Sequence, residues 1–318
     1  MATTAELLRR GHPFRQWKTW TMPASGLTLT GYSRSNDKTY FHVPELKLGL
    51  DAGLVESRQA ETLLLTHTHQ DHVRDLDYVA TRPDGVDIYV PEPTVPYVQE
   101  YFRVNTEINQ VAPYDATLAS PARLHGVRAG DEFRFGRRGA HVAQVVECEH
   151  KVPCVGYRVS EVRRGLTQEY QRLRDTLPQA DFGRLVAARR AAGDPVDEEI
   201  RRPLFAYLGD THADALTRYD WLADWPVVIT ECTYLDDTEL DRARRVGHTV
   251  WSQLRPIVLA HPDTVFVLIH FSLRHSDRDV VRFFREQEAL GVPLDNVVLW
   301  ATEDSHLPEQ HTRTAVTG

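Results

Sequence analysis

The chain has 318 residues, 42% apolar content and a formal net charge of −8. This length suffices for a large buried core, and the apolar content excludes a disordered protein. No run approaches the roughly 18 to 20 apolar residues of a membrane span. The acidic balance argues against a protein that coats nucleic acid over its whole surface.

The N-terminal segment carries early basic residues but no apolar stretch behind them, so no signal peptide is predicted. The odd number of cysteines fits neither a disulfide framework nor a CxxC zinc site; they are Cys148, Cys154 and Cys232. We therefore expect a cytoplasmic protein with no membrane partner.

Short β-like runs separated by turns fill the first half of the chain, at 26–33, 39–43, 46–53, 61–67, 86–91 and 141–150. The later part alternates apolar strands with helical segments. The strands are expected at 204–210, 227–234, 263–270 and 296–302, and the helices within 239–260 and at 278–290. There is no GxGxxG motif, and the pattern predicts two sheets covered by helices rather than a barrel or a Rossmann fold.

An insertion is predicted at 161–202, with helices at 166–177 and 182–193. Between Arg158 and Arg202 the chain has ten arginines and eight acidic residues. Such a run is usually a solvated surface, and contact with phosphates is the alternative. We expect a main domain at 25–302, an N-terminal extension at 1–24 and a flexible tail at 303–318.

The segment HTHQDH, residues 67–72, directly follows an apolar run. His67 and His69 are two residues apart, so in an extended segment they point to the same side. Asp71 and His72 come next. Imidazole nitrogens with a carboxylate are the ligands that zinc prefers, and a solvated polar loop is the alternative interpretation.

Three further residues of these types stand where apolar runs end: His150, Asp210 and His270. Each alone is typical of a cap or a loop. Strand ends in a layered α/β protein meet in one crevice, so together these residues can converge with 67–72. Seven ligand residues suit two metal ions about 3.5 to 4 Å apart, a centre suited to phosphodiester hydrolysis.

HTHQDH matches the HxHxDH signature of the metallo-β-lactamase superfamily, whose fold is an αββα sandwich. More narrowly, the chain resembles the short, plant-type form of ribonuclease Z, a tRNA 3′-processing endonuclease, from about Leu27 to Thr302. The matching segments are GLDAG, EHKVPCVGYRV, YLGDT and LIHFSLRHS.

The resemblance implies an αββα fold with an inserted helical arm and two zinc ions, for which Mn²⁺ or Fe²⁺ are possible substitutes. It implies one zinc held by His67, His69 and His150. The second would be held by Asp71, His72 and His270, with Asp210 bridging both. Asp71 would also orient or deprotonate the attacking water, and Asp51 would support the ligands from behind.

Two further segments, TECTY and GHTVWSQ, resemble the HEAT and HST segments of ribonuclease Z. The resemblance implies a Glu231–His248 dyad that donates a proton to the leaving oxygen, a role typically worth about 10²- to 10⁴-fold. In isolation the two residues would be a strand-end carboxylate and a surface histidine. Ser272 and Arg274 resemble the phosphate-contacting residues of the family, and an arginine fork suits that role.

In the family an inserted arm grips tRNA across a homodimer, so the resemblance implies precursor tRNA and a second copy of the chain as partners, with 161–202 as the arm. The predicted activity is endonucleolytic removal of 3′ trailers from precursor tRNA. The alternatives are a small-molecule phosphodiesterase, for example one acting on cyclic nucleotides, or another hydrolase of the superfamily. The predicted Glu231–His248 dyad speaks against an ester or lactone hydrolase.

Overall fold

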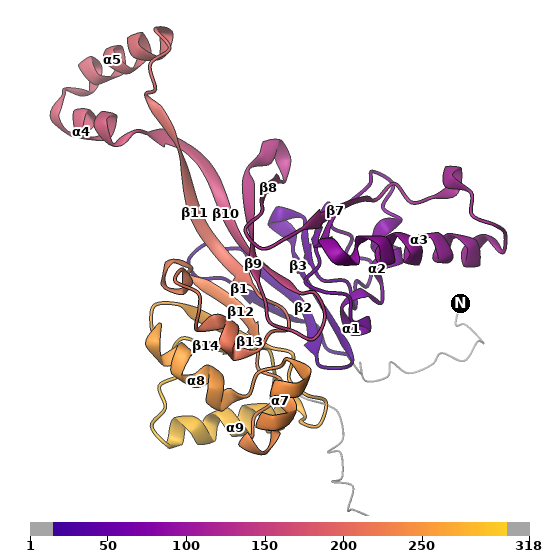
Figure 1. Cartoon of the computed structure of the whole chain (residues 1–318). Coiled ribbons are helices and arrows are strands. Elements are labelled where there is room, and N and C mark those ends of the chain that lie inside the picture. Colours follow the sequence, from indigo (N-terminus) through magenta and orange to yellow (C-terminus); the bar gives the residue numbers. More distant parts are fainter. Residues whose placement is uncertain (1–14, 304–318) are drawn as a thin grey trace, which may run out of the picture.

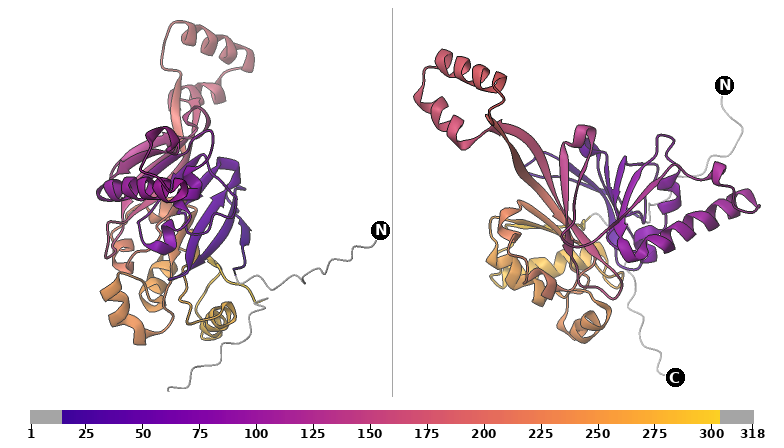
Figure 2. Two further views of the ribbon diagram at one scale, coloured as in Figure 1. Left: turned by 90° about the vertical axis from the view of Figure 1, so that its right-hand side faces the viewer. Right: turned by 45° about the horizontal axis from the view of Figure 1, so that its top comes forward.

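The computed structural model describes residues 15–303, so residues 1–14 of the predicted extension and nearly all of the predicted tail lie outside it. The described residues form two seven-stranded sheets that pack face to face, with helices on the outer faces (Figures 1 and 2). This arrangement is the predicted αββα sandwich. Within residues 15–303, no helix has the length and apolar character needed to cross a bilayer.

The first sheet runs in chain order and consists of β1 (Lys18–Thr21), β2 (Thr28–Arg34), β3 (Lys38–Val43), β4 (Leu48–Leu50), β5 (Thr62–Leu64), β6 (Asp87–Pro91) and β7 (Arg123–Val127). Strands β1 to β4 are antiparallel, and β4 to β7 are parallel. The associated helices are α1 (Gln70–Val73), α2 (Leu76–Ala80) and α3 (Val95–Gln110).

The second sheet contains β8 (Glu132–Phe135), β9 (His141–Glu147), β10 (Val155–Leu166), β11 (Asp197–Tyr207), β12 (Val227–Glu231), β13 (Val265–Ile269) and β14 (Val297–Leu299). Strands β8 to β11 are antiparallel and β11 to β14 are parallel, so this half repeats the topology of the first. Its helices are α6 (Ala213–Leu216), α7 (Leu240–Val246), α8 (Trp251–Ala260) and α9 (Asp277–Ala289).

Strand periodicity divides the apolar residues among three layers. In β5, Leu64 faces the core between the sheets, whereas Leu63 packs beneath the helices of the first half. In β11, Phe205 and Tyr207 enter the inter-sheet core, and Ala206 faces the helices of the second half. Successive side chains of a strand point to opposite faces, so buried strands of this kind carry apolar residues at nearly every position.

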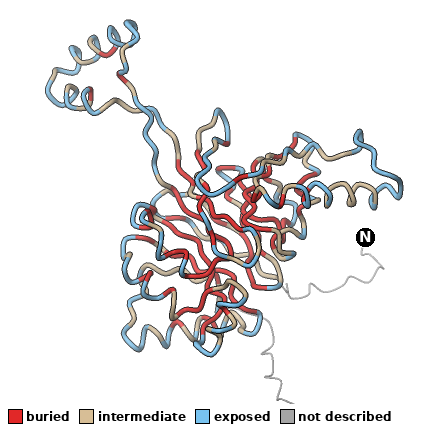
Figure 3. Tube along the Cα trace, in the orientation of Figure 1, coloured by how far each residue is buried: buried red, intermediate tan, exposed pale blue. Residues whose placement is uncertain are grey.

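An arm projects from the second sheet (Figure 1). Strands β10 and β11 continue out of the sheet as a two-stranded ribbon that ends with Leu166 opposite Asp197, and the ribbon carries α4 (Gln168–Thr176) and α5 (Gln179–Ala191). The arm is mostly exposed along its length (Figure 3) and has a small apolar cluster of its own, formed by Tyr170, Val186 and Val196. The two helices were predicted from the sequence, but the ribbon was not. Adjacent charged residues such as Arg163 and Arg164 interrupt the alternation of apolar and polar residues that indicates a strand.

Two elements differ from the expectations. Strand β1 lies within the segment predicted as an N-terminal extension, yet it pairs with β2, and the following Met22 is fully buried. Helix α3 was not predicted. Only Val98 of this helix is buried, and Val95, Tyr101 and Phe102 pack partly buried against the core of the first half.

Trp300 joins the two sheets. Its side chain follows β14, is 2% exposed, packs edge-on against Phe41 at 5.1 Å and donates from Nε1 to the carbonyl oxygen of Gly31 at 3.2 Å. We expect Trp300→Ala to lower the free energy of unfolding by about 3 to 5 kcal/mol, measured by urea denaturation. The half-exposed Leu259→Ala serves as control, with an expected change within about 0.5 kcal/mol. Equal effects of the two substitutions would contradict a role for Trp300 in holding the sheets together.

Candidate metal centre

The predicted ligand residues come from the ends of strands in both sheets. His67 and His69 follow β5, and Asp71 and His72 lie in α1. On the second sheet, the remaining three stand in the loops after β9, β11 and β13: His150, Asp210 and His270. All seven side chains lie in one crevice, as the sequence predicted; their role as ligands remains a prediction.

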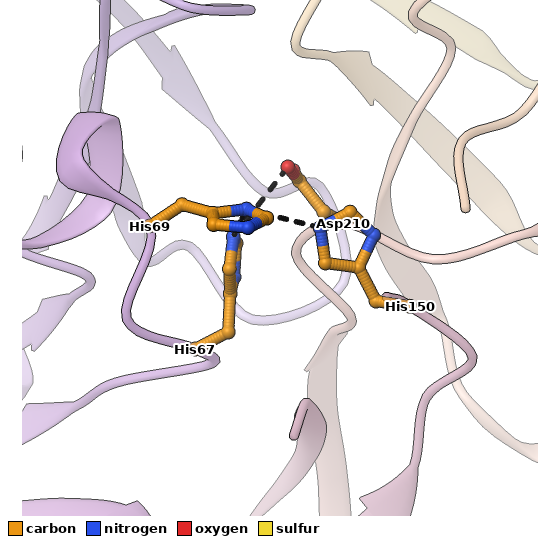
Figure 4. A group of neighbouring side chains, drawn as sticks. All are labelled: His67, His69, His150 and Asp210. Atoms are coloured by element: carbon orange, nitrogen blue, oxygen red, sulfur yellow. Dashed lines mark hydrogen bonds and ion pairs between the residues drawn. The ribbon is translucent and has the colours of Figure 1, made fainter. Parts of the chain in front are cut away.

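The side chains form two groups. In the first, the ligand atoms of His67, His69, His150 and Asp210 all lie within 4.8 Å of one another (Figure 4). In the second, Asp71, His72 and His270 satisfy the same limit. These two groups coincide with the division into two metal sites that the family resemblance implies, and a third, overlapping group consists of Asp210, His248 and His270.

Asp210 lies between the two groups. Its Oδ2 is 3.7 Å from Nε2 of His67 in the first group. The same oxygen is 3.5 Å from Nε2 of His72 and 3.4 Å from Nε2 of His270 in the second. One carboxylate therefore faces both groups, as expected of a bridging ligand.

Hydrogen bonds behind the imidazoles fix their orientation. Nδ1 of His72 donates to Asp51, and Nδ1 of His150 donates to the carbonyl oxygen of Gly247, each at 2.8 Å. Nδ1 of His67 and Nδ1 of His270 are hydrogen-bonded at 3.0 Å to neighbouring hydroxyls, those of Thr66 and Thr233 respectively. Because Nδ1 is engaged in each ring, Nε2 faces the centre, an arrangement typical of metal-ligating histidines.

The donor atoms fit divalent cations. His69 presents Nδ1, which lies 3.1 Å from Nε2 of His67 and 3.1 Å from Nε2 of His150. Nε2 of His72 and Oδ1 of Asp210 are buried and have no hydrogen-bond partner. Buried polar atoms are normally satisfied, so lone pairs that converge in this way point to a cation. Imidazole with carboxylate suits zinc and related transition metals.

Asp51 anchors the crevice from behind. It is fully buried, stands immediately after β4 and has a positive φ of 57°, a sparsely populated conformation for a residue other than glycine. Its carboxylate accepts from the backbone and hydroxyl of Thr66 at 2.8 and 2.9 Å, from His72 and from the hydroxyl of Tyr207. The backbone after it approaches α1 so closely that a Cβ at Gly53 would lie 1.9 Å from the carbonyl oxygen of Asp71.

Burial and neighbouring charges set the protonation states. Burial, with His150 and Lys151 nearby, lowers the pKa of His69 to about 4, so this ring is neutral at pH 7 and able to ligate. Burial alone would raise the pKa of Asp210, but His270 and His72 outweigh it and hold that pKa well below its usual range.

Glu231 and His248 form the predicted pair at the edge of the same crevice. Nδ1 of His248 donates to Glu231 at 2.8 Å, and the backbone N–H of Thr211 donates to the same Glu231 oxygen at 2.8 Å. The other oxygen accepts from the hydroxyl of Thr233 and from the N–H of Thr249. Burial opposes protonation of His248, but the Glu231 carboxylate outweighs it and, with Asp210, raises the His248 pKa to about 9.

The two predicted phosphate-binding residues lie outside the group that lines the crevice. Ser272 is 6% exposed, and its hydroxyl accepts from the backbone N–H of Arg274 at 3.3 Å. Arg274 is half-exposed and forms an ion pair with Glu239. Their phosphate-binding role stays a prediction that would require the Arg274 side chain to leave Glu239.

A cavity of about 250 Å³ opens above the histidines, and its lining includes Asp71, Asp210, His248 and His270. Two cations that the sequence analysis did not select also line it, Arg74 and Lys151. Both are adjacent or nearly adjacent in sequence to predicted ligands, His72 and His150. Their closeness in sequence to these two histidines could have identified them as residues of the cavity.

The comparisons with known proteins agree with this geometry. Residues 49–167 match the model of the Beta-lactamase superfamily domain. The solved metallo-β-lactamase fold protein YhfI from Bacillus subtilis shares the fold, with a TM-score of 0.52, 12% identity and coverage of 85% of this chain and 93% of that one. The chain thus has the metallo-β-lactamase fold, which confirms the predicted fold.

Its curated relatives are ribonucleases Z. The chain is 26% identical to tRNase Z TRZ1 of Arabidopsis thaliana, over 89% of this chain and 97% of the relative. It is 27% identical to the chloroplastic tRNase Z TRZ2 of the same plant, over 79% of this chain and 69% of the relative. The predicted resemblance to ribonuclease Z is therefore confirmed.

Gly247 offers a test of the imidazole orientation. It has φ +72°, and a Cβ there would lie 3.0 Å from both Cα and Nδ1 of His150. We expect Gly247→Ala to reduce the bound divalent metal measured by atomic emission, because the shift of His150 lowers metal affinity by about 10- to 100-fold.

Gly291→Ala is the matched control, because its φ is +86° and nothing lies within 4 Å of its Cβ position. Both substitutions incur the left-handed strain of about 1 to 2 kcal/mol, so a difference between the variants reports the contact with His150. Retention of all bound metal by Gly247→Ala would contradict a role for this contact in the centre.

Proposed function

We propose that the protein is a two-zinc phosphodiesterase, and specifically an endoribonuclease that removes 3′ trailers from precursor tRNA. The observation that carries the proposal is the Asp210 carboxylate between two groups of ligand residues, with the Glu231–His248 pair beside it. Nδ1 of His248 lies 3.9 Å from Oδ2 of Asp210. The names of the two plant relatives support the choice of substrate.

Zinc is the proposed metal, with Mn²⁺ or Fe²⁺ as substitutes. One ion would be held by His67, His69 and His150, the other by Asp71, His72 and His270, with Asp210 shared. Bound cations of this kind supply an activated water and stabilise negative charge on phosphoryl oxygens.

The protein's own groups would handle the protons. Asp71 lines the cavity, and its Oδ2 lies 3.3 Å from Nε2 of His270. In the proposed mechanism this carboxylate would orient or deprotonate the attacking water. His248 carries a proton at neutral pH because Glu231 raises its pKa, and it would donate that proton to the departing 3′ oxygen. Glu231, held by four hydrogen bonds, keeps the His248 ring in position.

The arm at 161–202 would bind tRNA at a distance from the cleavage site, and in a homodimer it would reach the tRNA on the partner copy. The main domain at 25–302 would carry the chemistry. A reducing compartment such as the cytoplasm is proposed because the three cysteines are buried and free.

A small-molecule phosphodiesterase is the second candidate. The observation that favours it is the charge of the arm, where most arginines are neutralised by nearby carboxylates; the paired arginines are Arg163, Arg174, Arg184, Arg189, Arg190 and Arg201. An arm of this kind offers fewer free cations to phosphates than its composition suggests.

A substrate comparison separates the two candidates. The zinc-loaded protein is incubated with a 3′-extended precursor tRNA, with cyclic nucleotides and with bis(p-nitrophenyl) phosphate. We expect endonucleolytic removal of the 3′ trailer. Turnover of the small diesters without any cut in the tRNA would eliminate the ribonuclease proposal in favour of the second candidate.

Removal of the arm tests its role. Residues 167–196 are replaced by Asn-Gly, which can close the ribbon between the paired residues Leu166 and Asp197. The ratio of kcat/KM for precursor tRNA to that for bis(p-nitrophenyl) phosphate should fall by about 10²-fold or more, because a second binding site is removed. A constant ratio would exclude the arm from tRNA binding.

His248 is tested by His248→Ala, with His261→Ala as control because, within the described residues, the His261 ring hydrogen-bonds only to the carbonyl oxygen of Ile257 one turn earlier. We expect His248→Ala to retain bound zinc and to lower kcat for precursor tRNA by about 10²- to 10⁴-fold. An unchanged kcat would remove His248 from the mechanism, and loss of zinc would assign it to the metal centre instead.

A further inference from the structure

Most cations in the described part of the chain are neutralised by carboxylates. Lys18, Lys38 and Lys47 each form an ion pair, as do most arginines of the arm. Within residues 15–303, a few basic residues near the crevice form no ion pair and no side-chain hydrogen bond; these are Arg74, Lys151, Arg244 and Arg245. Unpaired cations beside a catalytic cavity on an acidic protein create a local positive field.

Three of these cations share a second pocket, of about 160 Å³, lined by Lys151, Arg244 and Arg245 together with His150. Lys151 also lines the catalytic cavity. The two spaces therefore share Lys151 in their linings, at the loop that carries His150.

The same turn positions the pocket and the metal centre. Arg244 and Arg245 lie in the last turn of α7, which ends in the left-handed Gly247. The carbonyl oxygen of Gly247 accepts from His150, and its Cα packs so tightly that an added Cβ would lie 3.1 Å from the backbone nitrogen of Lys151. The distance from the arginines to the metal centre is thus set by rigid backbone contacts.

The two carboxylates of the pocket do not pair with its arginines. Glu149 accepts from Arg218 at 3.1 Å, and Asp214 lies 3.3 Å from Nδ1 of His212, a ring that also lines the pocket and accepts from the Asp214 backbone N–H. Neither forms an ion pair with Arg244 or Arg245, although they line the same pocket. The arginine forks are left available for a ligand anion, and guanidinium groups bind phosphate through two parallel hydrogen bonds.

We propose that Lys151, Arg244 and Arg245 form a subsite for a backbone phosphate of the RNA strand, next to the phosphate that is cleaved. The inference rests on the proposed function, and it adds a way for the enzyme to distinguish a polynucleotide from a small diester. A mononucleotide or an aryl diester fills the cavity alone, whereas an RNA strand reaches both spaces. Contacts to phosphates fix the register of a nucleic acid without reading its sequence.

A competing explanation is that the two arginines only complement the dipole at the C-terminal end of α7, as basic residues often do. That role predicts a loss of stability on substitution and no change in the salt dependence of RNA cleavage. A phosphate contact predicts a changed salt dependence of RNA cleavage and no loss of stability. Each phosphate contact contributes about 0.7 to the slope of log affinity against log salt for a single strand.

The test is the double substitution Arg244→Ala/Arg245→Ala in the zinc-loaded full chain. We expect kcat/KM for 3′-extended precursor tRNA, relative to that for bis(p-nitrophenyl) phosphate, to fall about tenfold or more. The slope of log kcat/KM against log[NaCl] should become shallower by about 0.7 for each phosphate that the variant no longer binds. Arg244→Lys/Arg245→Lys should recover most of the slope, since lysine binds phosphate as a point charge.

Arg255→Ala is the matched control, because this exposed arginine on α8 also forms no ion pair within residues 15–303 and lines neither space. If wild type cleaves the precursor and the double variant keeps the same slope and ratio, the subsite is overturned while the proposed function stands. A lower melting temperature with an unchanged slope would also overturn the subsite, in favour of the dipole explanation.

If wild type fails to cleave precursor tRNA, the proposed function is wrong. The subsite is then tested by RNA binding alone. Fluorescence anisotropy of a labelled 3′-extended RNA hairpin is measured with wild type and the double variant. Weaker, less salt-dependent binding by the double variant supports the phosphate subsite. Equal affinities, or no binding by wild type, overturn it.

Discussion

The buried Asp210 carboxylate between two sets of imidazoles is the interaction on which the rest of the site depends. A lone carboxylate in this position would be expensive to bury, and burial by itself would favour its neutral form. The rings of His72 and His270 reverse that preference and keep Asp210 ionised. The carboxylate and the converging ring nitrogens together form a cluster that is able to bind metal.

The fold supplies this arrangement through repetition. Each half contains antiparallel strands followed by parallel ones, and the parallel strands deliver their carboxyl ends to a common edge. In the first half, that edge provides Asp51 and the 67–72 segment. In the second it provides Asp210 and Glu231. The parallel bridge between Ser35 and Ser272 ties the two edges together, so neither half completes the crevice alone.

The sequence predicted which side chains converge, because clusters of histidine and aspartate are rare at strand ends and strand ends are visible as limits of apolar runs. HTHQDH, His150, Asp210 and His270 all satisfy that rule. The residues that orient these side chains are harder to find in the sequence. Thr66, Thr233 and Gly247 orient the rings, but threonine and glycine are common, and their contacts depend on segments distant in sequence. Helix α3 was also missed, although its apolar residues Val95, Val98 and Phe102 pack against the core of the first half.

The number of arginines in a segment does not show how many of them are free to bind an anion, because many form ion pairs with carboxylates. The arm is rich in arginine, yet six of its guanidinium groups are engaged with carboxylates of the arm or of β8, and exposed pairs of this kind contribute little stability. Arg244 and Arg245 do not stand out in the sequence, but α7 presents them without carboxylate partners beside His150. These cations thus gather beside the loop that carries His150. An overall acidic protein can in this way carry a local positive field at one point of its surface.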